Sequence, residues 1–187
     1  MSDWPVGLST GCFFQQSIFD CLETISRGGF NIIEVCSFPI HLDYHDYDMV
    51  VRAAHRVEEL GMEAYSFHAP FADHIDISSR DSDCRQRALA EVLQAAEAAA
   101  TFQVRYFVIH PGPESWDLKE HDERFERLKW AADSIRSLSV AVSSGSDSSW
   151  KINSHTCCLP TRATCSGFWL QWIPCRWVSV SIPAMLI

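Results

Sequence analysis

The stretch that decides the fold consists of Glu63-Ala-Tyr-Ser-Phe-His68, an Ala-rich helical segment from Asp81 to Ala100, and Val104-Arg-Tyr-Phe-Val-Ile-His110. The first and third parts are short apolar runs, each followed by a Pro-containing turn, which predicts two buried strands. A strand, a long helix and a second strand in succession predict a parallel pair joined by a helical crossover, because parallel strands cannot be joined by a tight turn. This unit therefore indicates an α/β protein.

The same alternation extends on both sides of this unit and gives four β-α units. The other expected elements are, in order, a strand at Val6–Cys12, helix Ser17–Arg27, strand Asn31–Cys36, helix Tyr47–Leu60 and helix His121–Leu138. This order fits an open doubly wound sheet or a β/α barrel. No glycine-rich phosphate-binding motif follows the first strand, which argues against nucleotide-binding open sheets. A complete barrel has eight units in about 250 residues, so four units make half of one.

The composition changes abruptly beyond Leu138. Only one of the 24 acidic residues, Asp147, lies after Ser137, whereas four of the seven Trp and four of the eight Cys do. No amphipathic period continues into this region, and a natural fold keeps local and global signals consistent. We therefore expect the N-terminal half of a barrel at residues 1–138 and an aberrant, poorly ordered tail at residues 139–187.

Charge and cysteine usage narrow the class of protein. A net charge of −9 argues against binding to a nucleic-acid backbone. The chain starts without a basic segment followed by an apolar run, so no signal peptide is expected. Cys12, Cys21, Cys36 and Cys84 lack metal or disulfide spacing, which is typical of buried thiols in a reducing cytoplasm. The apolar segment Phe168–Ile187 is interrupted by polar residues and prolines, so no membrane role is expected.

His68 and His110 are the candidate metal-binding and substrate-binding residues. Each closes a predicted strand, and the carboxyl ends of adjacent parallel strands converge on one pocket. Two imidazoles at that point could hold a divalent metal through a ring nitrogen. The alternative is that each histidine only caps its strand by hydrogen bonding to nearby backbone.

Glu34 is the candidate catalytic residue. It lies on the second predicted strand and could face the barrel interior or its mouth, where a carboxylate can bind substrate or orient a histidine. A buried structural ion pair is the alternative role. The other histidines at positions His41, His45, His74 and His121 lie in polar loops or at helix starts, and we expect them at the surface.

These motifs together resemble the xylose isomerase-like barrel superfamily, which includes sugar phosphate isomerases and epimerases and endonuclease IV. The resemblance covers approximately residues 6–137 and rests on the His68-Ala-Pro-Phe turn, the His110-Pro-Gly turn and Asn31-Ile-Ile-Glu34-Val. It implies a TIM-type barrel, a divalent metal (Mn, Zn, Co or Mg) and a sugar or sugar phosphate as substrate. In the endonuclease IV branch, histidines matching His68 and His110 bind metal. In the epimerase branch, acids and a histidine from strands five to eight mainly hold it.

The family also has a fifth strand ending in Glu-Asn and a sixth ending in Asp-Thr-Gly-His, and neither occurs in residues 139–187. Both are permitted in one alternative reading frame. In that frame, each codon consists of the last base of one present codon and the first two bases of the next. Read in this way, the codons of Trp150 and Lys151 must give Glu, and those of Trp177 and Val178 must give Gly. The codons that follow permit the rest of each motif. We therefore hypothesise a one-base deletion between about codons 138 and 149. A genuinely divergent tail, or an alternatively ended product, is the alternative.

The resemblance thus predicts a truncated sugar phosphate isomerase or epimerase, whose intact form acts on a sugar or sugar phosphate with a divalent metal. The chain as given is expected to be inactive, because it lacks the C-terminal half of the active site. The alternatives are an endonuclease IV-like, metal-dependent phosphodiesterase and an inactive half-barrel fragment. A half-barrel leaves sheet edges unpaired, so pairing with a second copy into a homo-oligomer is possible.

Overall fold

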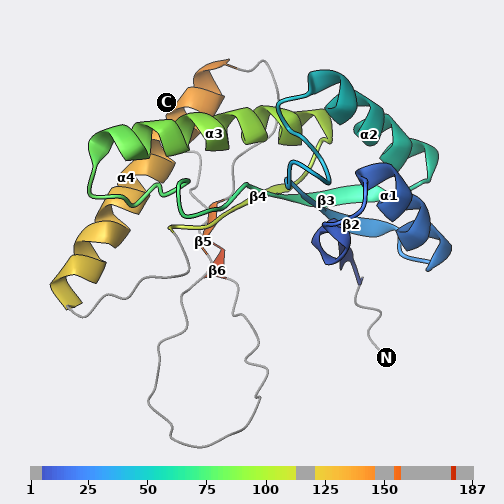
Figure 1. The fold of residues 1–187 in the computed structure, drawn as a ribbon, viewed down its shortest axis with the longest axis horizontal. Coiled ribbons are helices and arrows are strands. Elements are labelled where there is room, and N and C mark those ends of the chain that lie inside the picture. Colours follow the sequence, from blue (N-terminus) through green and yellow to red (C-terminus); the bar gives the residue numbers. More distant parts are fainter. Residues whose placement is uncertain (1–5, 113–120, 146–153, 157–177, 180–187) are drawn as a thin grey trace, which may run out of the picture.

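Five parallel strands with helical crossovers form the framework of the molecule (Figure 1). The structure is a computed structural model and describes residues 6–112, 121–145, 154–156 and 178–179. In sheet order, the strands are β1 (Leu8–Ser9), β2 (Ile32–Cys36), β3 (Glu63–His68), β4 (Tyr106–Ile109) and β5 (Ser154–Thr156), and β6 (Val178–Ser179) joins β5 antiparallel. The helices are η1 (Thr10–Phe13), α1 (Ile18–Arg27), α2 (Tyr47–Glu59), α3 (Ser82–Thr101) and α4 (His121–Gly145).

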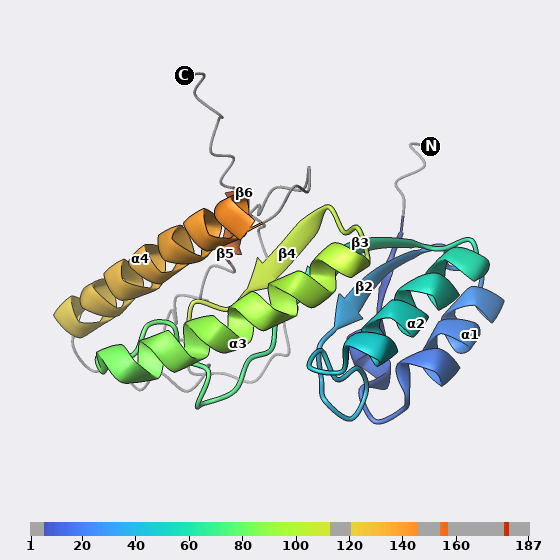
Figure 2. The same ribbon diagram turned by 90° about the horizontal axis from the view of Figure 1, so that it is seen from above.

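The predicted α/β class with a parallel sheet is confirmed. Helices α1, α2 and α3 lie over one face of the sheet, and α4 lies beside α3 (Figures 1 and 2). This is the arrangement of one side of a β/α barrel, in which helices cover the outside of the sheet. No helix in the described part of the chain combines the length and hydropathy needed to cross a bilayer.

Local sequence signals explain where α1, α2 and α3 begin and where α1 and α2 end. Side-chain oxygens of Ser17, Asp46 and Asp81 accept backbone N–H groups at the starts of α1, α2 and α3. Each cap of this kind stabilises a helix by about 1 kcal/mol. Gly29 and Gly61 follow α1 and α2 with φ of +84° and +65°, a backbone conformation that strains any residue with a Cβ atom.

The structure differs from the expected elements mainly at the two ends. The first strand is shorter than Val6–Cys12, because Thr10–Phe13 forms the turn η1. Helix α4 runs past Leu138 to Gly145, since no glycine or proline interrupts the chain before that point. The region predicted to be a poorly ordered tail contains β5 and β6; its residues 146–153, 157–177 and 180–187 lie outside the described residues.

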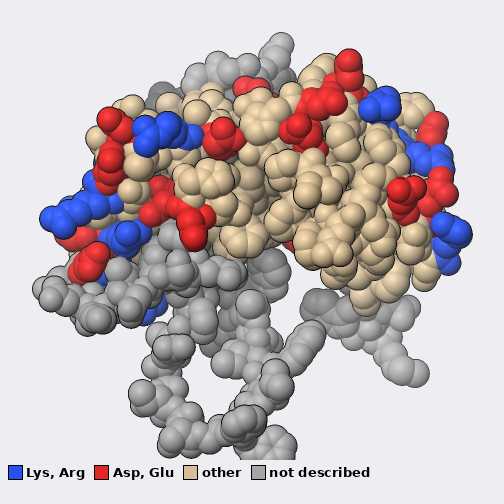
Figure 3. Space-filling view, viewed as in Figure 1, with Lys and Arg blue, Asp and Glu red and all other residues tan. Residues whose placement is uncertain are grey.

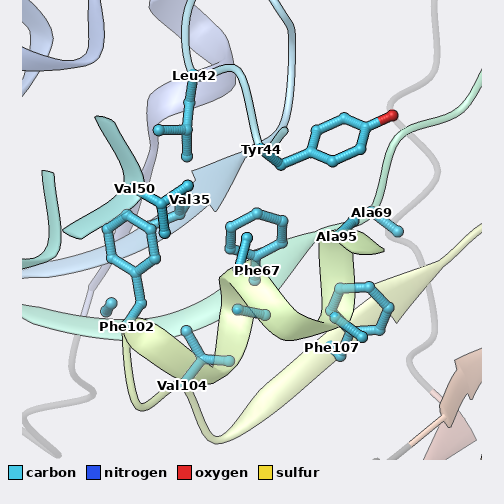
Figure 4. Packing of buried hydrophobic residues seen from close by; sticks show 14 of the residues in the cluster. Val35, Leu42, Tyr44, Val50, Phe67, Ala69, Ala95, Phe102, Val104 and Phe107 are labelled. Carbon is cyan, nitrogen blue, oxygen red and sulfur yellow. The ribbon is translucent and has the colours of Figure 1, made fainter. Parts of the chain in front are cut away.

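The core lies between the sheet and the helices (Figure 4). The Phe67 ring on β3 stacks with the Phe107 ring on β4 and contacts the Phe102 ring after α3, with centroids 6.0 Å apart in both pairs. Phe67 is completely buried, as is Ala95 on the Ala-rich face of α3. Small side chains on this face allow the helix to approach the sheet closely, and burial of each large apolar side chain contributes about 1.5–3 kcal/mol.

Strand register places the polar residues on the opposite face of the sheet. Ser9 on β1, Glu34 on β2 and Ser66 on β3 are register partners, and Cys36 and His68 form the next row toward the carboxyl ends. A register shift at Glu34 absorbs one extra residue of β3 and keeps these rows aligned. At about 3.3 Å per residue, the two rows lie roughly 6.6 Å apart along the strands.

Candidate functional site

His68 and His110 lie side by side at the carboxyl ends of β3 and β4. Their Nε2 atoms are 3.0 Å apart, and their ring centroids are separated by 4.9 Å. The Nδ1 atom of His68 lies 2.9 Å from the carbonyl oxygen of Ala69. Since a carbonyl only accepts, Nδ1 carries the proton, and Nε2 of neutral His68 presents its lone pair. The Nε2–H of His110 then donates to that lone pair.

The two Nε2 atoms lie close enough together for both to contact one metal ion. An ion that bound both imidazoles with metal–nitrogen distances of about 2.1 Å would hold the two nitrogens roughly 3–3.4 Å apart, and the observed separation is 3.0 Å. The contact from His68 Nδ1 to a backbone carbonyl is also typical of a metal-binding histidine, whose second ring nitrogen is held by an acceptor. No cluster of three or more His, Cys, Asp or Glu side chains suited to a metal occurs among the described residues. The pair therefore fits as part of a metal site, and further ligands would have to come from outside this pair.

Glu34 faces the same side of the sheet but is not part of the histidine pair. Its Oε1 accepts a hydrogen bond from Ser9 Oγ at 2.8 Å, and its Oε2 accepts one from Ser66 Oγ at 3.3 Å. Within the described residues, no Lys, Arg or His forms an ion pair with it. By strand register, Glu34 lies one row deeper in the sheet than His68. Its carboxylate is held by the two serine hydroxyls, which a substrate hydroxyl could replace.

Phe71 is a site residue that the sequence reasoning missed. Its ring stacks on the His110 ring with centroids 4.3 Å apart and an interplanar angle of 13°, and it meets the His68 ring edge-on at 5.6 Å. These contacts restrict both imidazoles. The sequence did contain the signal, because Phe71 is the aromatic residue of the His68-Ala-Pro-Phe turn.

A cavity of about 400 Å³ opens beside the histidine pair. It lies between the loop after β2, the loop after β3 and helix α3, and its lining includes His68 and Phe71. His45 and His74 also line it, and both are exposed, as expected. The side chain of His121 lies outside the described residues.

The expectation that His41 lies at the surface is wrong. Its side chain is completely buried, because the loop after β2 packs on the start of α1 and the Ile18 N–H donates to the His41 carbonyl. The Nδ1 atom lies 2.7 Å from the Gln16 carbonyl oxygen, whereas the buried Nε2 has no hydrogen-bond partner within the described part of the chain. Burial lowers the pKa of His41, so the ring is neutral at pH 7.

The cysteines are partly as expected. All four in the described residues are free, and Cys21 and Cys36 are buried, whereas Cys12 is exposed and Cys84 is half-buried. Burial raises the pKa of Cys21 to about 12 and that of Cys36 to about 11. These two thiols are therefore protonated and unreactive at neutral pH.

Parallel strands in sequential order, helices over one face of the sheet (Figure 1) and imidazoles at the carboxyl ends of adjacent strands together match the β/α barrel class, since open doubly wound sheets carry helices on both faces. Residues 22–145 match the family described as xylose isomerase-like TIM barrel. The chain belongs to this family. A search of curated proteins found no match.

Solved structures of sugar epimerases share the fold. D-psicose 3-epimerase, determined in the presence of D-fructose, superposes with a TM-score of 0.64 at 13% identity, over 79% of this chain and 50% of that chain. A D-tagatose 3-epimerase-like protein superposes with a TM-score of 0.62 at 20% identity, over 80% of this chain and 51% of that chain. The 3-keto-D-glucoside 4-epimerase from E. coli superposes with a TM-score of 0.58 at 16% identity, over 82% of this chain and 56% of that chain. The chain thus spans about half the length of these structures, and at these identities the likeness shows the fold.

Proposed function

We propose that this chain provides the N-terminal half of the active site of a divalent-metal-dependent sugar isomerase or epimerase. The observation that carries the proposal is the His68–His110 pair, whose Nε2 atoms are 3.0 Å apart at the carboxyl ends of β3 and β4. Barrel enzymes place their chemistry at this end of the sheet. The names of the structural neighbours, which are epimerases of sugars, support the same reaction class.

In this proposal, His68 and His110 hold the metal through Nε2, and the remaining ligands come from the other half of the barrel. When bound, the ion polarises a carbonyl or an adjacent hydroxyl of the sugar. The Ala69 carbonyl fixes the His68 ring through Nδ1, and the Phe71 ring holds His110 in place. Glu34 binds a substrate hydroxyl or orients the sugar from the row below.

We further propose that residues 139–187 are encoded one base out of frame. The abrupt composition change, and the Glu-Asn and Asp-Thr-Gly-His motifs permitted in the alternative frame, support this reading. The restored segment would supply strands five and six with metal ligands of the epimerase type. The chain as given would then be an inactive half of the barrel.

The test compares the chain as given with a version whose gene carries one inserted base that restores the alternative frame. Both are incubated with D-tagatose or D-fructose and Mn²⁺ or Co²⁺, and the sugars are separated by chromatography. We expect activity only from the restored version, with loss after chelation and in the His68→Ala and His110→Ala variants. The exposed His55 on α2 provides the control, since His55→Ala should retain activity. A restored chain that folds and binds metal but converts no sugar would contradict the proposal.

We also propose a cytoplasmic location, which the free thiols of the described residues support. On the face shown in Figure 3, Lys and Arg lie beside Asp and Glu near the two ends and form no extended basic patch, which fits a small-molecule substrate better than nucleic acid. Pairing with a second copy remains a proposal that a sedimentation experiment would test.

A further inference from the structure

The cavity beside the histidine pair has two aromatic walls. It lies between the loops that follow β2 and β3, and its volume of about 400 Å³ is in the range of small-molecule sites. The Phe38 and Phe71 rings line it and meet edge-on with centroids 6.4 Å apart. His68 is part of the same lining, so the cavity is continuous with the proposed metal site. A molecule reacting at His68 could therefore extend its other end into this cavity.

Glu91 on α3 provides a polar group for this cavity. Its Oε2 accepts hydrogen bonds from Tyr44 Oη at 2.8 Å and from His45 Nε2 at 3.1 Å. Burial, together with the neighbouring carboxylate, raises the pKa of Tyr44, so the phenol keeps the proton that it donates. Among the contacts of the described residues, both hydrogen bonds to Glu91 use Oε2. Oε1 therefore has acceptor capacity for a ligand hydroxyl.

The charges around the cavity disfavour an anion. Its lining, within the described residues, contains the carboxylate of Glu91 and no Lys or Arg. His45 is held between Asp43, at 3.0 Å, and Glu91. Even if His45 is protonated, its single positive charge lies beside two carboxylates, so the local net charge is negative. A phosphate ester carries about 1.5–2 negative charges at neutral pH, and at the Glu91 end of the cavity the described lining offers it no Lys or Arg.

We propose that this cavity binds the non-reacting end of an uncharged sugar or polyol, with Glu91 accepting a hydroxyl, and that it discriminates against sugar phosphates. The inference rests on the proposed function, because it extends the same site outward from His68. It also narrows that function, since a sugar and its phosphate ester would otherwise both fit the reaction class. Glu91 is accordingly a specificity-determining residue.

The test measures binding of D-fructose and D-fructose 6-phosphate to the full chain by NMR titration at pH 8, where the phosphate ester is fully ionised. A phosphate about 5 Å from a carboxylate in water is repelled by roughly 1–2 kcal/mol, so we expect the neutral sugar to bind about tenfold more tightly. Glu91→Gln should reduce this ratio, and Glu91→Lys should reverse it. Glu97→Lys on the exposed face of the same helix makes an identical charge change outside the cavity and should leave the ratio unaltered.

Circular dichroism of each variant establishes that it folds. If Glu91→Lys does not fold, the test uses Glu91→Gln, which keeps the shape of the side chain and removes its charge. The proposal is overturned if wild type binds both compounds equally, if neither binds, or if the two lysine variants change the ratio alike. A separate Co²⁺ titration with His68→Ala tests the metal site. If the chain discriminates between the two compounds but binds no metal, the proposed function is wrong and the Glu91 subsite is still supported.

Discussion

Helix α4 is fastened to the loop before α3 by a largely buried ion pair. Arg127 Nη1 lies 2.9 Å from Asp76 Oδ2, and the two side chains are only 21% and 12% exposed. Asp76 Oδ1 also accepts the backbone N–H and the hydroxyl of Ser78, and Ser134 Oγ on α4 donates to the Ile77 carbonyl at 2.8 Å. The same loop carries part of the cavity wall, so this contact links the stability of α4 to the shape of the site.

We predict that Arg127→Met, which keeps the apolar stem and removes the charge, destabilises the chain by about 2–3 kcal/mol. Removing one partner of a fully buried pair costs about 3–5 kcal/mol, and exposed pairs contribute about 0–1 kcal/mol. The partial exposure of this pair places it between these limits. In a double-mutant cycle with Asp76→Asn, the coupling should be about 1–2 kcal/mol, because the neutral amide that replaces the carboxylate leaves no charge for Arg127 to neutralise.

Urea unfolding at pH 7, followed by circular dichroism, measures these free energies. The exposed pair between Arg136 and Asp133 on the same helix is the matched control, with side chains that are 72% and 57% exposed. Its cycle should give a coupling of at most about 0.5 kcal/mol. Equal losses for Arg127→Met and Arg136→Met would refute the reasoning, since burial would then make no difference to the ion pair.

Two further predictions concern the core and the pH dependence of stability. Phe67→Ala should lower the free energy of unfolding by about 3–5 kcal/mol, whereas Phe125→Ala, at a side chain 63% exposed, should change it by at most about 0.5 kcal/mol; similar urea midpoints for the two variants would contradict the packing described for β3. His41 is neutral when folded and has a lowered pKa, so the unfolded chain binds its proton more readily. The free energy of unfolding should therefore not depend on His41 well above pH 6.5. Below pH 6.5 it should decrease by up to about 1.4 kcal/mol per pH unit. His41→Asn should reduce this slope in urea titrations between pH 7.5 and 5.5, and an unchanged slope would exclude His41 as its source.

The sequence predicted the elements best where local signals are strong. Strand β3 has the expected bounds Glu63–His68, because a short apolar run lies between Gly61 and the Ala69-Pro70 turn. Helix α4 was predicted too short, since the composition change near Leu138 says nothing about helix propensity in the next turn. Strand β5 lies in a segment without a strand pattern, and its pairing with β4 is a tertiary feature.

The site was predictable only in part for a related reason. Adjacent parallel strands bring their carboxyl ends together, and this rule alone placed His68 and His110 side by side. The burial of His41 depends on how the loop after β2 packs against α1, which no local pattern encodes. The cavity likewise requires Glu91, Tyr44 and the two loops to meet in space. Polar residues in loops look alike in sequence whether they face solvent or one another.

The most direct test of the account is a Zn²⁺ titration of the full chain, followed by ¹⁵N NMR of the histidine ring nitrogens. We predict that one equivalent shifts the Nε2 signals of His68 and His110 together, while Nδ1 of His68 stays protonated against the Ala69 carbonyl. His68→Ala should abolish the shift at His110, and the exposed His55 should not respond in either protein. If His68 and His110 do not shift, or shift no more than His55, the pair is not a metal site and the proposed function fails.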